Sequence, residues 1–506
     1  MIGSLKDTGL KGSCMKRSSG ILLPLYSLPS PYGIGTMGRC AYEFVDFLAA
    51  SGQKYWQLLP LGHTDHGNSP YSSPSSFAGN PFLIDLDMLI EDGLIALSDV
   101  DGVNWGEDPE TVDYPAIRGH RMTVLRTAFN NCGERFAEER DSFYNENLRW
   151  LSDYALFMAL KDRFGGSPWF SWPDDIRRRD PDAVERCSRY LKTEIDFYVF
   201  VQFLFFRQWD MLQSYAHGKG ISFIGDLPIY VAMDSADLWS EPWFFQLDGD
   251  LQPLALSGAP PDGFSPDGQL WGNPLYDYDK MRDDGFGWWI RRMEGAWRLY
   301  DVVRIDHFRG FESYWSVPVN ASSAKAGEWK KGPGMALVGV LTSWFNTHDY
   351  IAEDLGYITP EVTSLLEESG LPGMKVLQFA FDPDGDSRYL PHNIEKNSVC
   401  YVGTHDNDTI LGWAEDSDPE TVEYARRYMG INGSEGWCHG FIRTGMASAS
   451  DLFIMTMQDI LQLPGYARTN VPGVAEGNWK WRMKADALSE ELASRLYDMT
   501  HVYRRV

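Results

Sequence analysis

The feature that most constrains the fold of this chain is a series of short apolar runs, each of which ends in turn residues or carboxylates. Runs of this kind are typical of strands that are buried on both faces of a sheet. Stretches long enough for a helix lie between most of them, and 39–50, 287–300 and 359–369 have an apolar helical face. The runs are 20–26, 55–61, 221–231, 301–310, 350–356, 374–381, 398–408 and 451–463.

Alternating strands and helices predict parallel strands that are joined by crossover helices. About eight such units favour an α/β fold of the (β/α)8 TIM-barrel type, with large insertions, over an open doubly wound sheet.

Two intervals are too long to be simple connections between barrel elements. Segment 62–220 is expected to be a mainly helical insertion, since 145–163 and 188–216 carry apolar residues at helical spacing. Segment 232–286 is rich in Gly, Pro, Asp and aromatic residues and is expected to be an irregular, lid-like insertion. Because no Pro/Ser-rich linker separates these parts, we expect 1–506 to be a single catalytic barrel domain.

Composition and charge exclude several classes of partner. The net charge of −26, without any Lys/Arg-rich run, disfavours nucleic acid and anionic lipid. The N-terminus lacks the apolar core of a signal peptide, and no run of about 18 apolar residues occurs. The 6 cysteines form no CxxC pair, which indicates a reducing compartment. We therefore expect a cytoplasmic protein with no membrane or nucleic-acid partner.

Acidic residues lie at or near the ends of four expected strands. Barrel enzymes place their chemistry at this end of the strands, although an Asp there can also cap the next helix. Converging carboxylates repel one another unless a cation or a substrate charge organises them, which leaves divalent metal binding and glycosyl transfer as chemistries. The residues are Asp226, Asp306, Glu353 with Asp354, and Asp406 with Asp408.

The sequence around these acids favours the sugar chemistry. Arg304 lies two residues before Asp306, so both side chains point to the same side of a strand. We expect the guanidinium to keep Asp306 ionised, as a nucleophile requires. Glu353 follows an apolar run and is expected to have a raised pKa, as a proton donor needs. Asp406 follows His405, and this pair is suited to holding sugar hydroxyls.

A metal site is not expected. Arg304 would place a permanent positive charge beside the ligands of any cation. The acidic stretch 382–386 superficially resembles a calcium loop, but it lacks the glycine and the terminal glutamate at the required positions.

Longer motifs occur in order along the chain, and together they resemble those of one family. They are GNSPYSSPSSFA (67–78), GDLPIYVAMDSADLW (225–239), GAPPDGFSPDGQLWGNPLY (258–276), RIDHFRG (304–310), IAEDLG (351–356), LPHN (390–393), GTHDNDT (403–409), NVPG (470–473) and NW (478–479). From about residue 20 to residue 482, the sequence resembles the 4-α-glucanotransferases of the amylomaltase or disproportionating-enzyme family, which are related to the α-amylases.

The resemblance implies roles for individual residues. Asp306 matches the catalytic nucleophile, Glu353 the general acid/base, and Asp406 the third carboxylate, which engages substrate hydroxyls. Gly263 departs from the family, which usually has a larger side chain, often aromatic, before Phe264. The expected substrate-binding residues are Tyr71, Asp226, Asp262, Phe264, Trp271, Arg304, His307, Asp354, His405 and Asn470.

The activity implied by the resemblance is retaining transfer of an α-1,4-glucan segment. The donor is a malto-oligosaccharide, the acceptor is the 4-hydroxyl of a glucan or of glucose, and the intermediate is a covalent β-glucosyl-Asp. No redox or phosphate step is involved and no Gly-rich phosphate loop is present, so no cofactor is expected. An α-glucan hydrolase, a metal-dependent barrel lyase or hydrolase, and a non-catalytic glucan-binding protein stay open as alternatives.

Overall fold

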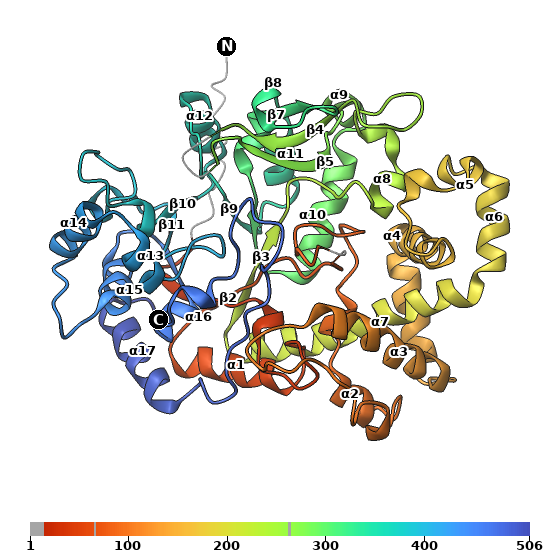
Figure 1. The fold of residues 1–506 in the computed structure, drawn as a ribbon, viewed down its shortest axis with the longest axis horizontal. Coiled ribbons are helices and arrows are strands. Elements are labelled where there is room, and N and C mark those ends of the chain that lie inside the picture. The colour runs from red at the N-terminus through yellow and green to blue at the C-terminus, as the bar shows by residue number, and fades with distance from the viewer. Residues whose placement is uncertain (1–14, 65–66, 262–264) are drawn as a thin grey trace, which may run out of the picture.

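A closed barrel of eight parallel strands forms the centre of the protein (Figure 1). The structure is a computed structural model and describes residues 15–64, 67–261 and 265–506. Strand β1 pairs with both β2 and β12, which closes the barrel and confirms the predicted (β/α)8 fold. The strands are β1 Ser18–Leu22, β2 Tyr55–Gln57, β3 Ser222–Leu227, β6 Val302–Ile305, β9 Asp349–Ala352, β10 Gly373–Val376, β11 Ser398–Tyr401 and β12 Leu452–Thr456.

Each strand occupies only part of its apolar run, and the remainder turns over the carboxyl end of the barrel. After β3, for example, Ile229 and Tyr230 are buried although they lie outside the strand. After β10, the apolar residues continue as a 3₁₀ turn, Leu377–Phe379. The loops that carry polar residues at this end are therefore anchored by buried apolar side chains.

Helices surround the barrel and make up most of segment 62–220. Three predicted helices begin and end within one residue of the expected bounds: α1 Arg39–Ala50, α10 Gly287–Leu299 and α12 Pro360–Ser369. Among the described residues, no helix has the length and apolar character needed to cross a membrane. The other helices around the barrel are α11 Met335–Trp344, α13 Ile410–Asp416, α14 Pro419–Met429, α15 Trp437–Ala447, α16 Met457–Ile460 and α17 Glu490–Val502.

Segment 62–220 is largely helical, and Figure 1 shows most of its helices on the side opposite α14 and α15. The expected helix 188–216 is interrupted at Leu191, where α6 ends and α7 begins. The expected helix 145–163 starts earlier, because the charged residues from Ala137 onward are helical without showing an apolar face. The helices are α2 Leu86–Glu91, α3 Tyr114–Asn131, α4 Ala137–Arg163, α5 Asp174–Arg177, α6 Pro181–Tyr190 and α7 Lys192–Gly218.

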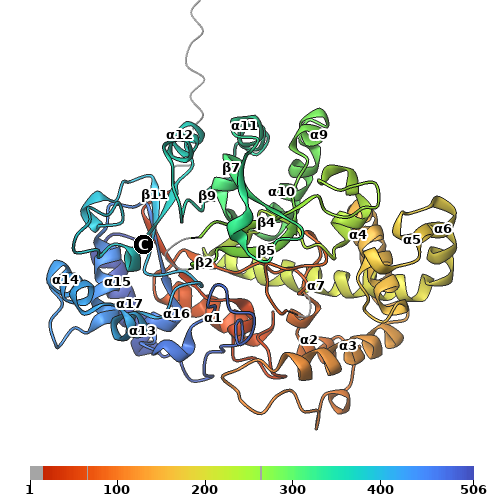
Figure 2. The same ribbon diagram turned by 45° about the horizontal axis from the view of Figure 1, so that its top comes forward.

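Segment 232–286 is not irregular throughout. It contains the short helices α8 Ala236–Ser240 and α9 Tyr278–Asp283 and two strands of an antiparallel sheet, which lies above the barrel strands in Figure 1 and to their right in Figure 2. Periodicity did not predict this sheet, because its other strands come from beyond β6 and its own strands are rich in Gly, Pro and Ser. In sheet order the strands are β5 Gln269–Pro274, β4 Ala255–Ala259, β7 Ser313–Pro318 and β8 Glu328–Lys331.

A close approach of a ring to β3 fixes the backbone just before the strand-end carboxylate Asp226. A Cβ at Gly225 would lie 2.0 Å from Cδ2 of Tyr300. The ring cannot easily move away, because Tyr300 is 5% exposed and its hydroxyl accepts a hydrogen bond of 3.1 Å from the backbone N–H of Leu61. Only glycine allows this packing.

We expect Gly225→Ala to lower the free energy of unfolding by about 1–3 kcal/mol, the usual cost of an overpacked core. Urea unfolding measures this change. The control is Gly249→Ala, where an added Cβ would meet no atom within 4 Å. Equal stability of the two variants would show that the Tyr300 ring can move aside at little cost in free energy.

Candidate active site

The carboxyl ends of three neighbouring strands bring the predicted acids together. Across β3 and β6, Asp226 lies opposite Arg304, and across β6 and β9, Ile305 lies opposite Ala352. Asp306 and Glu353 follow these last paired residues directly. The backbone N–H of Glu353 donates to the carbonyl of Ile305 at 3.0 Å, which extends the ladder by one residue. Asp306 and Glu353 therefore occupy equivalent places on adjacent strands.

Arg304 lies between two of the carboxylates. Its Nη1 donates to Oδ1 and Oδ2 of Asp226 at 2.6 and 2.7 Å, and to Oδ1 of Asp306 at 3.2 Å. The side chains of Arg304 and Asp226 are 5% and 0% exposed, whereas that of Asp306 is 27% exposed. Asp226 is thus the closer and more deeply buried partner of Arg304, whereas the carboxylate of Asp306 remains accessible to a substrate.

Arg304 lowers the pKa of Asp306, as expected from its positive charge, but burial outweighs this effect. The pKa of Asp306 is raised well above its usual value, because burial disfavours the carboxylate by more than Arg304 favours it. Much of the guanidinium charge is compensated by Asp226, and the negative charges of Asp226 and Glu353 raise the pKa of Asp306 further. Positive charge that develops on a bound substrate would favour the ionised form.

Glu353 is buried, with 8% of its surface exposed, and its pKa is raised mainly by this burial, in the predicted direction. Both of its oxygens accept backbone hydrogen bonds, Oε2 from His307 N at 2.7 Å and Oε1 from Leu355 N at 2.8 Å. These bonds moderate the shift and fix the direction of the carboxyl group. The N–H of His307 reaches it from a left-handed backbone conformation, with φ at 47°.

Asp406 follows β11 and is held by a segment that comes after the last barrel strand. Its Oδ1 accepts a hydrogen bond of 2.6 Å from Nδ2 of Asn470, and Nε2 of His405 lies 3.3 Å from the same oxygen. Nη2 of Arg468 donates to the carbonyl of Asp406 at 2.6 Å. The Asp406 side chain itself is 45% exposed, so it is both oriented and accessible.

Tyr71 links the two groups of carboxylates. Its hydroxyl donates to Oδ2 of Asp226 at 2.8 Å and lies 2.9 Å from Nε2 of His405, and its ring stacks on His405 with centroids 5.3 Å apart. Burial raises the pKa of Tyr71 and lowers that of His405, so the hydroxyl stays protonated and the imidazole neutral. Since the Tyr71 oxygen and Asp406 both face Nε2 as acceptors, we infer that His405 carries its proton there.

Trp479 supports this pair and was not assigned a role from the sequence. Its ring centroid lies 5.9 Å from those of Tyr71 and His405. Its backbone is fixed by a hydrogen bond of 2.8 Å from its N–H to the carbonyl of Thr469 and by one of 2.7 Å from the Tyr114 hydroxyl to its own carbonyl. The NW motif was the available signal, but nothing in the sequence places residue 479 beside residue 71.

Trp271 and Asp354, which were also predicted to bind substrate, lie in surroundings that differ from each other. The ring of Trp271, on β5, meets that of His307 edge to face with centroids 4.8 Å apart, which places it next to the strand-end acids. The carboxylate of Asp354 is 2% exposed and accepts hydrogen bonds from Met374 N at 2.7 Å and Arg388 Nη2 at 3.0 Å. Asp354 thus joins β9 to β10 and Arg388, and these contacts fit a positioning role.

The predicted residues Asp262 and Phe264 lie outside the described residues. Within the described ranges, no group of three or more His, Cys, Asp or Glu side chains is arranged to hold a metal ion. The other predicted site residues, from Tyr71 to Asn470, surround the carboxyl end of the barrel. A partly exposed acid beside a buried one, with a third held nearby, is an arrangement able to cleave and form glycosidic bonds.

Comparison with known proteins identifies the family. A family model described as 4-alpha-glucanotransferase matches residues 23–488. The chain belongs to the 4-alpha-glucanotransferase family. A relative of that name from Clostridium butyricum is 47% identical over 481 residues, covering 95% of this chain and 99% of the relative. Another from Thermus thermophilus is 45% identical over 505 residues, covering 97% and 100%.

Solved structures agree with this assignment. The amylomaltase from Streptococcus agalactiae in complex with acarbose superposes with a TM-score of 0.95 at 42% identity, covering 97% of this chain and 100% of that one. The amylomaltase from Corynebacterium glutamicum, at 20% identity and a TM-score of 0.77, covers 97% of this chain and 75% of that one and shares the fold.

We expect Trp479→Leu to lower kcat/KM for glucanotransfer by about 2–12-fold, because the ring pairs with Tyr71 and His405 are lost. Trp479→Phe should restore part of the loss. Steady-state kinetics with malto-oligosaccharides measures kcat and KM separately. The matched control is Trp344→Leu, at a ring that is 67% exposed on α11. The same loss in both variants would contradict the supporting role.

Proposed function

We propose that this member of the 4-alpha-glucanotransferase family transfers α-1,4-glucan segments between malto-oligosaccharides by a retaining mechanism through a covalent Asp306 intermediate. The observation that carries this proposal is the placement of Asp306 and Glu353 at equivalent positions on adjacent strands. Neighbouring strands lie about 5 Å apart. Retaining enzymes use carboxyl groups at about this separation, whereas inverting enzymes need more room for a water molecule.

In the first half-reaction, a carboxylate oxygen of Asp306 attacks the anomeric carbon of the donor. The glycosidic C–O bond breaks, and Glu353 gives its proton to the leaving oxygen. The buried position of Glu353 and its raised pKa support this role, since the group must be protonated near neutral pH. The products are a shortened glucan and a β-glucosyl ester on Asp306.

In the second half-reaction, Glu353 acts as a base. It takes the proton from the 4-hydroxyl of the acceptor, whose oxygen attacks the anomeric carbon while the ester bond to Asp306 breaks. Two inversions retain the α-configuration. Asp406, held by Asn470 and His405, is proposed to accept hydrogen bonds from sugar hydroxyls as the ring flattens in the transition state.

Transfer competes with hydrolysis, because water can replace the acceptor. An acceptor held in reactive geometry can have an effective molarity of about 10⁵ M or more, which exceeds the concentration of water, about 55 M. We propose that Trp271 and the loop around it hold the acceptor sugar, which its contact with His307 beside the acids supports.

The proposed substrates are α-1,4-glucans and malto-oligosaccharides, and neither step calls for a cofactor. We further propose that 62–220 and 232–286 are insertions in one catalytic unit. The cytoplasmic location and the lack of a nucleic-acid partner stay predictions from the sequence.

Incubation with maltotriose, followed by chromatography of the products, tests the proposed activity. A transferase gives both shorter and longer malto-oligosaccharides. Release of glucose and maltose alone would favour the α-glucan hydrolase. If exhaustive dialysis against EDTA abolished the activity and calcium or magnesium restored it, the metal-dependent alternative would gain support instead.

We expect Asp306→Asn and Glu353→Gln each to raise the barrier by about 4 kcal/mol or more, roughly a thousandfold in rate. The first change removes the nucleophile and the second removes the proton donor. Both variants should stay folded, which circular dichroism checks, and Asp384→Asn in the exposed turn 382–386 is the control. Retention of over about a tenth of the transfer rate by either variant would refute its assigned role.

For Trp271→Ala we expect the hydrolysis-to-transfer ratio to rise by about 5–30-fold, because loss of one stacking face costs an acceptor sugar roughly 1–2 kcal/mol. Total donor cleavage should fall by less. The same chromatography on maltotriose gives both quantities. An unchanged ratio in a folded variant would mean that the ring is only a structural cover.

A further inference from the structure

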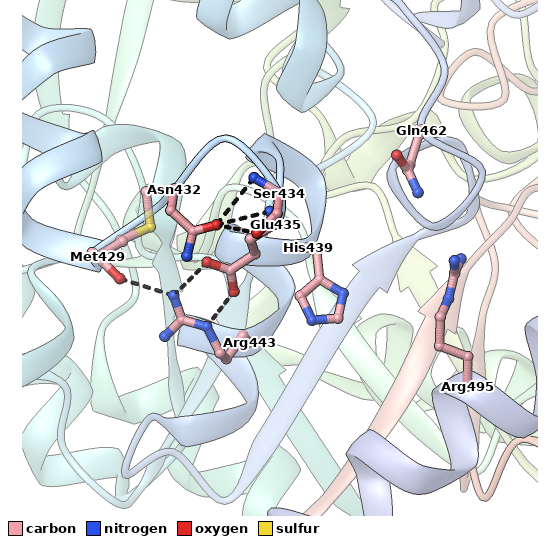
Figure 3. A pocket seen from close by; sticks show the side chains of 9 residues that line it. Met429, Asn432, Ser434, Glu435, His439, Arg443, Gln462 and Arg495 are labelled. Atoms are coloured by element: carbon pink, nitrogen blue, oxygen red, sulfur yellow. Dashed lines mark hydrogen bonds and ion pairs between the residues drawn. The ribbon is translucent and has the colours of Figure 1, made fainter.

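A cavity of about 690 Å³ lies on the outside of the barrel, and none of the proposed catalytic or substrate-binding residues lines it. Its wall comes from three places that are distant in sequence (Figure 3). These are the turn between α14 and α15 together with the start of α15, Gln462 after α16, and Arg495 on α17. The established fold and the proposed reaction give this cavity no role.

The hydrogen-bond acceptors of the wall are largely used within the wall itself. Oδ1 of Asn432 accepts three hydrogen bonds, from N and Oγ of Ser434 at 3.1 and 2.6 Å and from N of Glu435 at 3.1 Å. Both carboxylate oxygens of Glu435 are bound by Arg443, from Nε at 2.5 Å and Nη2 at 3.1 Å. Neither side chain therefore offers a strong free acceptor to a ligand.

Several hydrogen-bond donors of the wall, in contrast, are not used within it. In the part of the chain that the structure describes, no protein hydrogen bond is found for Nδ2 of Asn432, the side-chain amide of Gln462, the ring of His439 or the guanidinium of Arg495. Asn432, Gln462 and Arg495 are exposed and His439 is half-buried, so these donors are accessible to a ligand. Figure 3 shows the side chains of His439, Gln462 and Arg495 around one opening. A wall whose acceptors are used and whose donors are free is complementary to a ligand rich in acceptors.

The charges point in the same direction. Arg443 compensates Glu435, whereas no ion pair is found for Arg495 among the described residues, so a positively charged side chain remains available at the cavity. This is out of keeping with a chain of net charge −26. The lining residues include no Phe, Tyr or Trp ring on which a sugar could stack. An anion is thus favoured over a neutral glucan.

We propose that this cavity binds a small oxyanion, a phosphate group carried either by inorganic phosphate or by a sugar phosphate, between Arg495, His439 and the amide groups of Gln462 and Asn432. Arginine donates charge-assisted hydrogen bonds that match the geometry of phosphate oxygens. The Glu435–Arg443 pair holds the turn that carries Asn432, and Nη2 of Arg443 also donates to the carbonyl of Met429 at 2.8 Å.

Isothermal titration at constant ionic strength tests the proposal with three probes: inorganic phosphate, glucose 1-phosphate and glucose. The variants are Arg495→Gln and His439→Gln. The matched control is Arg427→Gln, which removes the same charge from the neighbouring α14 at an exposed residue that does not line the cavity. We expect one saturable site for the phosphate probes, weakened about tenfold or more by Arg495→Gln, several-fold by His439→Gln and less than twofold by Arg427→Gln.

Tighter binding of glucose 1-phosphate than of inorganic phosphate would identify a sugar phosphate as the ligand, and similar binding of both would identify the phosphate group alone. Three outcomes would overturn the proposal: no saturable binding of either phosphate probe, glucose binding as tight as that of the phosphates, or equal weakening by Arg495→Gln and Arg427→Gln. Because none of these residues belongs to the proposed catalytic site, glucanotransfer by the variants should equal that of the wild type and report that they are folded.

Discussion

The buried pair of Arg304 and Asp226 is the interaction on which the geometry of the site depends. Its two side chains are 5% and 0% exposed, and removal of one partner would leave an uncompensated charge in the barrel. Each member also holds a second group, because Arg304 reaches Asp306 and Asp226 accepts the hydroxyl of Tyr71. The same ion pair thus orients the proposed nucleophile and connects it to the aromatic wall of the site.

The closed barrel makes this arrangement possible. Parallel strands in fixed register bring side chains from β3, β6 and β9 to one end, and closure through β1 and β12 brings the last part of the chain beside the first. Tyr71 and Trp479 illustrate the result, since they are in ring contact although about four fifths of the chain separates them. Backbone hydrogen bonds to Glu353 then set the direction of the proposed acid.

The sequence was sufficient to predict the barrel and the acids at its strand ends, because apolar runs and strand-end carboxylates are local patterns. It could not predict the antiparallel sheet, in which β4 pairs with β7 although β6 lies between them in the sequence. It also could not predict the role of Trp479. The net rise in the pKa of Asp306 was not predicted, because Arg304 is near in sequence whereas its closer partner, Asp226, is not. The burial of Asp306 and the pairing of Arg304 with Asp226 are properties of the folded chain, and the local sequence pattern did not reveal them.

The dependence of Asp406 on Asn470 has a consequence for biosynthesis. The ribosome makes the chain from the N-terminus, and the acids Asp306, Glu353 and Asp406 are all synthesised before β12 can close the barrel and before Asn470 and Trp479 exist. A nascent chain therefore contains every acid of the site long before it can orient them. Glucan cleavage would therefore begin only after nearly the whole chain has been translated.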